Sequence, residues 1–176
     1  SLILSKRYNK LGIYLRNKSD KQILLDDVKS LLTQDFQEID IETISYQNPE
    51  LNEIYGGIQL PGPNIIDFAN VRGFFGHHRY SLCGITHTTA SHAIMDSFSS
   101  LLTENVMPWD AIICTSESVL NTANKILEAR KEYLLKRFNI NKPILPKLPI
   151  IPLGINCEEF EFDNNFISKS RNDFNI

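Results

Sequence analysis

Several common features are scarce in this 176-residue chain, and each absence excludes a class of protein. Its three cysteines, Cys83, Cys114 and Cys157, are far apart and form no CxxC pair. This spacing argues against a disulfide framework or a zinc ribbon and favours a reducing compartment. No apolar run is long enough to predict a membrane span. The first residues, SLILSKRYNK, do not have the pattern of a signal peptide, so we expect a cytoplasmic protein.

The motifs of the commonest nucleotide and hydrolase sites are also missing. The chain has neither a GxGxxG fingerprint nor a Walker A loop, which removes the usual dinucleotide and nucleoside-triphosphate sites. The stretch CTSES (114–118) lacks the GxSxG elbow, so Ser116 is predicted to cap a helix rather than act as a nucleophile. A net charge of −3 lacks the basic excess of a nucleic-acid binder, and we expect no nucleic-acid partner.

Strand-like and helix-like segments alternate along most of the chain. Strands are expected at 11–15, 39–46, 79–86, 111–116 and 148–155, and helices at 21–34, 88–102 and 118–137. Turn sequences fill residues 48–76, where we expect loops around at most one short strand or helix. The alternation indicates βαβ units and hence an α/β domain over residues 1–160, a doubly wound, mostly parallel, Rossmann-like sheet. Residues 161–176 lose periodicity and are expected to form a linker or terminus.

All four histidines lie between His77 and His92, which raises the question of a metal site. His87 and His92 are five residues apart, about 140° around a helix, rather than the four that a metalloprotease pair requires. His77 and His78 precede the expected strand, whereas His87 follows it. We therefore expect no metal, with His77, His78 and His92 as surface or satisfied polar residues. His87 is the exception, because ligands of parallel sheets collect where strands end and helices begin.

Three segments, in this order, resemble the amino-terminal half of family-four retaining glycosyltransferases of the GT-B fold: YSLCGITHT (80–88), PWDAIICTSESV (108–119) and LPIIPLGINCEEF (148–160). The resemblance covers residues 79–160 and is weak over the first seventy residues. It implies two Rossmann-like domains across a cleft, the first receiving a sugar, lipid-linked or other acceptor and the second a nucleotide-sugar donor. It also implies retention of anomeric configuration, with no metal or other cofactor. The donor-binding domain is absent from this chain, so we expect a half-enzyme that is inactive alone.

By this resemblance, His87 is the histidine that reaches the transferred sugar near the reaction centre. The residues that the resemblance and the strand-end turns assign to substrate binding are Thr86, Thr88, Ser116, Glu117, Gly154 and Asn156. The chain departs from the family after its first strand, because LGIYLRNKSD (11–20) lacks the Gly-Gly loop that often lies near the donor phosphates.

Two alternatives stay open. Residues 125–147 carry seven basic residues against Glu128 and Glu132. A basic amphipathic helix at 118–137 can dock on an anionic membrane or a partner, which would make the chain a non-catalytic binding module at the membrane periphery. The competing explanation for the charges is a solvated helix face. The second alternative is another sugar-nucleotide enzyme of the same fold, such as an epimerase.

Overall fold

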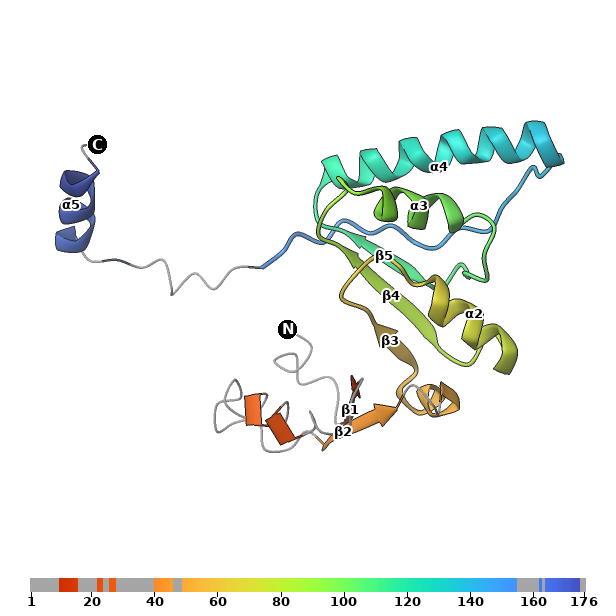
Figure 1. Cartoon of the computed structure of the whole chain (residues 1–176), viewed down its shortest axis with the longest axis horizontal. Coiled ribbons are helices and arrows are strands. Elements are labelled where there is room, and N and C mark those ends of the chain that lie inside the picture. Colours follow the sequence, from red (N-terminus) through yellow and green to blue (C-terminus); the bar gives the residue numbers. More distant parts are fainter. Residues whose placement is uncertain are drawn as a thin grey trace.

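The computed structural model describes residues 10–15, 22–23, 26–27, 40–45, 49–154, 162 and 164–174, and Figure 1 shows its elements. The strands are β1 (Lys10–Leu15), β2 (Asp40–Ser45), β3 (Gly57–Gln59), β4 (Ser81–Thr86) and β5 (Ala111–Cys114). The helices are the 3-10 helix η3 (Pro49–Tyr55), α2 (Ile66–Phe75), α3 (His92–Ser100), α4 (Glu117–Phe138) and α5 (Asn164–Asp173). All pairings between the strands are parallel, which confirms the predicted α/β class.

The strands form two small sheets, β1-β2 and β3-β4-β5, in place of the single sheet that the sequence predicts. In the second sheet, Leu82 of β4 pairs with Ile58 of β3, and Ile113 of β5 pairs with Ile85 of β4. Alternate side chains of a strand point to the same side, and those of Leu82 and Ile112 are buried. Residues on the other side, including Cys83, Ile85 and Ile113, are partly exposed.

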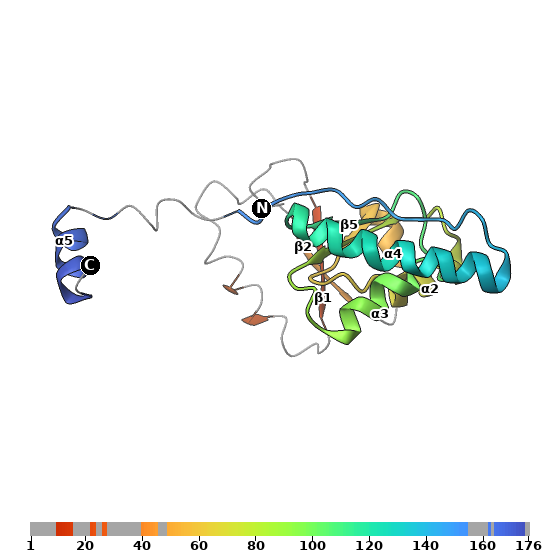
Figure 2. The same ribbon diagram turned by 90° about the horizontal axis from the view of Figure 1, so that it is seen from above.

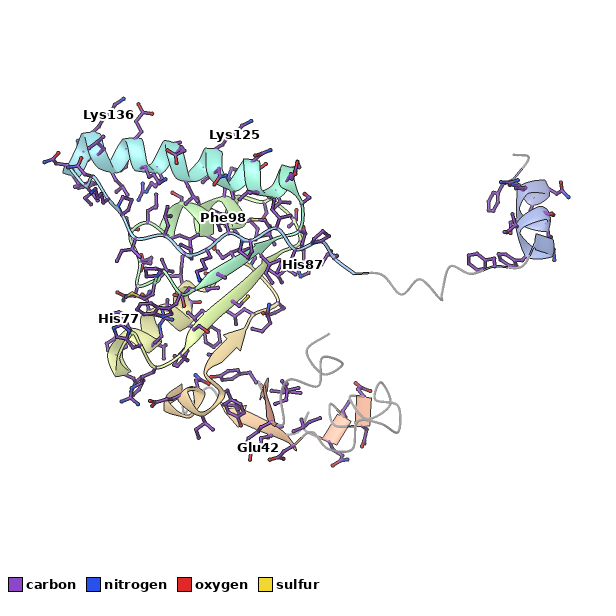
Figure 3. The ribbon with its side chains drawn as sticks, turned by 180° about the vertical axis from the view of Figure 1, so that it is seen from behind. Glu42, His77, His87, Phe98, Lys125 and Lys136 are labelled. Atoms are coloured by element: carbon purple, nitrogen blue, oxygen red, sulfur yellow. The ribbon has the colours of Figure 1, made fainter. Side chains whose placement is uncertain are left out.

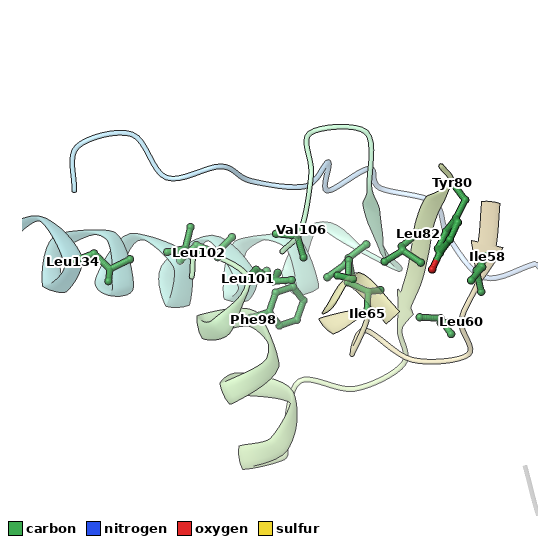
Figure 4. Close-up of a cluster of buried hydrophobic side chains, with 14 residues drawn as sticks. Ile58, Leu60, Ile65, Tyr80, Leu82, Phe98, Leu101, Leu102, Val106 and Leu134 are labelled. Carbon is green, nitrogen blue, oxygen red and sulfur yellow. The ribbon is translucent and has the colours of Figure 1, made fainter. Parts of the chain in front are cut away.

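One hydrophobic core joins the buried side of the three-stranded sheet to α2, α3 and α4, whose arrangement Figure 2 shows and whose buried side chains Figure 4 draws. Its buried members are Ile58, Leu60, Ile65, Ala69, Tyr80, Leu82, Phe98, Leu101, Leu102, Val106, Ile112, Ala123, Leu127 and Leu134. In the described part of the chain, these three helices therefore cover the same side of the sheet. Burial of aliphatic and aromatic side chains, at roughly 25 cal/mol per Å² of apolar surface, is the main force holding this layer together.

Where the last strand was expected, at 148–155, residues 147–151 pair with the edge of β5 without forming a continuous ladder. Lys147 N donates to Asp110 O at 2.8 Å, and Ile151 N donates to Cys114 O at 3.0 Å. In return, Ile112 N donates to Lys147 O at 2.8 Å and Cys114 N donates to Pro149 O at 2.9 Å. The bond that residue 149 would donate is missing, because Pro149 has no N–H. Two isolated parallel bridges remain, one at Lys147, just before the predicted strand, and one at Ile150 within it.

The 3-10 helix η3 connects the two sheets through tyrosine side chains. The Tyr14 hydroxyl of β1 donates to Asn52 Oδ1, and the Tyr14 ring meets Phe68 of α2 edge-on, with centroids 5.7 Å apart. Tyr55 of η3 donates to Glu42 Oε2 of β2 at 2.7 Å. These contacts attach β1 and β2 to the larger sheet.

Three segments need comparison with the sequence prediction, and the prediction for the first of them is wrong. Residues 48–76 hold η3, β3 and the ten-residue α2, so the expectation of at most one short element there is wrong. The segment expected as a linker or terminus contains α5. The predicted helix at 21–34 falls largely outside the described residues, of which 22–23 and 26–27 are helical.

Candidate functional site

The carboxyl ends of β4 and β5 lie side by side, because Thr86 pairs with Cys114. The two turns that follow, residues 86–88 and 115–117, form what we call the strand-end rim. The Thr115 hydroxyl donates to the Thr86 carbonyl oxygen at 3.0 Å and holds the two turns together. The structure thus brings His87, Thr88, Ser116 and Glu117 to one edge of the sheet, and Figure 3 shows His87 there. The sequence analysis did not single out Thr115, although it lies within the CTSES turn.

The rim side chains offer both hydrogen-bond donors and acceptors to solvent. His87, Thr88, Ser116 and Glu117 are all exposed. Ser116 Oγ accepts from Val119 N at 3.2 Å and caps α4, as predicted, while Thr88 Oγ1 accepts from Ala90 N at 3.2 Å. Each hydroxyl keeps its O–H as a donor, and a neutral imidazole donates from one nitrogen and accepts at the other. This mixture suits a ligand rich in hydroxyl groups.

The positions at which α3 and α4 begin determine how much positive partial charge reaches the rim, and hence which ligand charge the rim favours. α3 begins at His92 rather than Thr88, because Ser91 is extended and accepts from Ile94 N at 3.4 Å. Its amino-terminal partial charge therefore lies four residues beyond His87. At the start of α4 the partial positive charge is met by the carboxylate of Glu117. A neutral hydroxyl ligand fits beside Glu117 better than a phosphate does.

Two further predicted residues lie in different surroundings. Thr86 is fully buried and its Oγ1 has no hydrogen-bond partner among the described residues, so this side chain lies beneath the rim surface. Gly154 is exposed, and a Cβ atom at this position would meet no atom within 4 Å. Asn156 lies outside the described residues. The third predicted turn is therefore placed only as far as Gly154.

The histidines and the two cysteines that the structure describes, Cys83 and Cys114, do not form one cluster. His77 and His78 precede β4 and His87 follows it, so they lie at opposite ends of the strand (Figure 3). His78 stacks on Trp109 with ring centroids 4.6 Å apart. No three His, Cys, Asp or Glu residues in the described ranges are grouped so that they could hold a metal ion. Burial raises the pKa of the thiols of Cys83 and Cys114, which disfavours the nucleophilic thiolate.

A buried ion pair that the sequence analysis missed lies at the amino ends of the strands. Arg72 of α2 and Asp110, just before β5, are both fully buried. The guanidinium binds the carboxylate through two parallel bonds, Nη1 to Oδ1 at 2.6 Å and Nη2 to Oδ2 at 2.7 Å. Such a bidentate geometry fixes the orientation of both side chains.

Backbone groups complete the surroundings of this pair. Asp110 Oδ1 also accepts from Leu82 N at 2.9 Å, and Oδ2 accepts from Met107 N at 2.8 Å. Arg72 Nη1 donates to Tyr80 O at 2.9 Å, and Nη2 donates to Asn105 O at 3.2 Å. The pair therefore connects α2, the start of β4 and the loop before β5. It sets the relative position of the two strands whose other ends form the rim.

Comparison of the chain with protein-family models, with curated proteins and with solved structures found no match. No helix in the described part of the chain is both long and apolar enough to cross a lipid bilayer. The resemblance of residues 79–160 to glycosyltransferases therefore stays a prediction from three sequence segments.

Proposed function

We propose that this chain is the acceptor-side, amino-terminal half of a retaining glycosyltransferase of the GT-B fold. In this proposal it moves a sugar from a nucleotide-sugar donor to an acceptor, and a donor-binding domain supplies the other side of the cleft. The observation that carries the proposal is the strand-end rim. Two adjacent parallel strands end in turns joined by the bond from Thr115 to Thr86, and they present an imidazole, two hydroxyls and a carboxylate to solvent.

The chemistry of the rim agrees with a positioning role. Transfer of a glycosyl group passes through a transition state with positive charge on the sugar and negative charge on the leaving phosphate, so much of its catalysis comes from orientation and electrostatic stabilisation. In the proposal, His87 hydrogen-bonds a hydroxyl of the donor sugar rather than acting as a general base. Glu117 and the O–H groups of Thr88 and Ser116 bind other sugar hydroxyls.

Substitution of His87 tests this role in the native gene product. Nucleotide release is measured from a panel of uridine, guanosine and adenosine diphosphate sugars, first for the wild type and then for His87→Ala. Loss of one preorganised hydrogen-bond donor costs on the order of 100-fold in rate, and we expect that loss for His87→Ala. The anomeric configuration of the product sugar, read by proton NMR, should match that of the donor.

His78→Ala is the matched control, because it removes a histidine at the other end of β4, where the ring stacks on Trp109. We expect its rate to stay within about threefold of the wild type, since it touches no rim residue and an exposed surface substitution changes stability little. A His87→Ala rate equal to that of His78→Ala would refute the assignment of His87. Absence of nucleotide release from the whole panel by the wild-type product would count against the transferase itself.

A further inference from the structure

The carboxyl-terminal end of α4 and the segment after it form a surface that the proposed transfer reaction does not use. We call residues 133–144 the basic end. They contain Lys136, Arg137 and Lys142 and no acidic residue, although the whole chain has a net charge of −3. Arg137 and Lys142 are exposed, and neither forms an ion pair with any residue that the structure describes. The basic end is thus a local excess of positive charge on an acidic protein.

The basic end also contains large apolar side chains that are exposed. Their exposed fractions are 46% for Tyr133, 46% for Leu135, 59% for Phe138, 41% for Ile140 and 51% for Ile144. The left-handed residue Asn139 ends the helix, and Ile140 N donates back to Leu134 O at 3.4 Å. The backbone at Ile140 therefore stays against the last turn of α4, and the Phe138 ring meets the Tyr133 ring edge-on with centroids 6.1 Å apart. A helix face that is merely solvated carries charge without such a group of aromatic and aliphatic side chains.

We propose that the basic end binds the surface of an anionic lipid bilayer. Lys136, Arg137 and Lys142 lie at the level of the lipid phosphates, and the apolar side chains enter the boundary between headgroups and acyl chains. Positive charge combined with exposed Phe, Tyr, Leu and Ile is the pattern of peripheral membrane segments. Each basic residue near an anionic surface strengthens binding about fivefold, and the effect falls off within a Debye length.

The two acidic residues nearest the basic end do not oppose this binding, because each is paired with a lysine. Glu128, five residues before the basic end, pairs with Lys131 at 2.6 Å, and Glu132, directly before it, pairs with Lys136 at 2.5 Å. Lys136 is thus partly neutralised, while Arg137 and Lys142 carry the attraction. Upstream, Lys125 adds a further exposed charge on the same helix (Figure 3).

The geometry keeps the membrane away from the strand-end rim. α4 has 22 residues, and at a rise of about 1.5 Å each it is about 33 Å long. Ser116 and the rim lie at one end of α4 and Phe138 at the other (Figure 1). Docking at the basic end therefore leaves the rim open. It is independent of the proposed transferase activity, and each can fail without the other.

Sedimentation with vesicles tests the proposal on the full chain. Vesicles of phosphatidylcholine alone are compared with vesicles that also contain phosphatidylglycerol, at low and high salt. We expect binding to the anionic vesicles only, weakened by salt. Arg137→Gln with Lys142→Gln should reduce binding about 25-fold, at about fivefold for each charge. The control pair Lys169→Gln and Arg171→Gln, which removes the same charge from exposed positions of α5, should leave binding unchanged.

The apolar contribution has its own variant and control. Phe138→Gln with Ile140→Gln should reduce binding at least about tenfold, because both side chains lose apolar burial in the bilayer. Phe174→Gln, at a position 76% exposed beyond α5, should have no effect. Circular dichroism checks that each variant folds. Equal binding to neutral and anionic vesicles, or no binding at all, overturns the proposal. So does a dimer, detected by light scattering, that Phe138→Gln dissociates, because the apolar side chains then serve a second copy.

Discussion

The buried pair of Arg72 and Asp110 supports the most exacting prediction about stability. Asp110→Asn keeps the shape of the side chain but removes its charge and places an NH2 group where one carboxylate oxygen stood. Each of these oxygens accepts two bonds, Oδ1 from Arg72 Nη1 and Leu82 N, and Oδ2 from Arg72 Nη2 and Met107 N. The NH2 group of the new amide is a hydrogen-bond donor, and it would face two other donors, one from Arg72 and one from the backbone. The Arg72 charge also loses its counter-ion at a fully buried site.

The expected cost follows from this loss. Removing one partner of a buried ion pair destabilises a protein by about 3–5 kcal/mol, because an uncompensated buried charge remains. Whole domains are stable by about 5–15 kcal/mol, so the variant should be marginal. With a denaturant slope of about 2 kcal/mol per molar urea, the unfolding midpoint should fall by roughly 1.5–2.5 M. Urea titration followed by far-ultraviolet circular dichroism measures it.

An exposed ion pair provides the matched control. Arg79 and Glu53 are 2.6 Å apart, with 42% and 53% of their side chains exposed. Glu53→Gln should cost less than about 1 kcal/mol, since exposed pairs contribute little. The double variant Arg72→Met with Asp110→Leu should cost less than the sum of its single variants, because it leaves no buried charge unpaired. An Asp110→Asn midpoint as close to the wild type as that of Glu53→Gln would refute the reasoning.

Two further predictions concern packing and ionisation. Gly84→Ala should lower the free energy of unfolding by about 1–3 kcal/mol in the same urea titration, because its Cβ would lie 2.7 Å from Gly62 O. The control Gly62→Ala should be nearly neutral, because no atom lies within 4 Å of its Cβ position. Equal unfolding midpoints for the two variants would contradict this. Burial, followed by the hydrogen bond to Glu42, raises the pKa of Tyr55 to about 12. Because this folded-state pKa is above the unfolded value, Tyr55 favours folding below about pH 10, and that contribution is lost between about pH 10 and 12. The difference between absorbance titrations of wild type and Tyr55→Phe should have its midpoint near 12, and a midpoint near 10 would exclude the effect.

The elements with regular hydrophobic patterns are those that sequence reasoning placed well. β4 and β5 differ from their predicted bounds by two residues or fewer at each end, and α4 by one residue. In α4, buried Ala123, Leu127 and Leu134 recur at helical spacing, and Ser116 provides a recognisable cap. The rim follows directly from these elements, because adjacent parallel strands end at the same edge of a sheet.

The missed features depend on contacts that no local pattern records. α2 buries Arg72 on the same helix as Ala69, and a charged residue on the apolar face conceals the helical period. Only its partner, Asp110, 38 positions away, makes that burial favourable. The edge segment at 147–151 has a strand-like composition, but the missing N–H of Pro149 interrupts its ladder. α3 begins later than predicted because Ser91, rather than a residue near Thr88, caps it. Several residues in this stretch can cap a helix, so the local sequence does not decide between them.

The central claim is that the strand-end rim works against a second domain that binds a nucleotide-sugar donor. The most direct test is the intact mass of the native gene product, measured by mass spectrometry from its source cells. The account predicts a product longer than this chain by about 150–200 residues, the size of one further domain. A native product that ends at Ile176 would contradict the account, because no donor domain would then belong to the same chain.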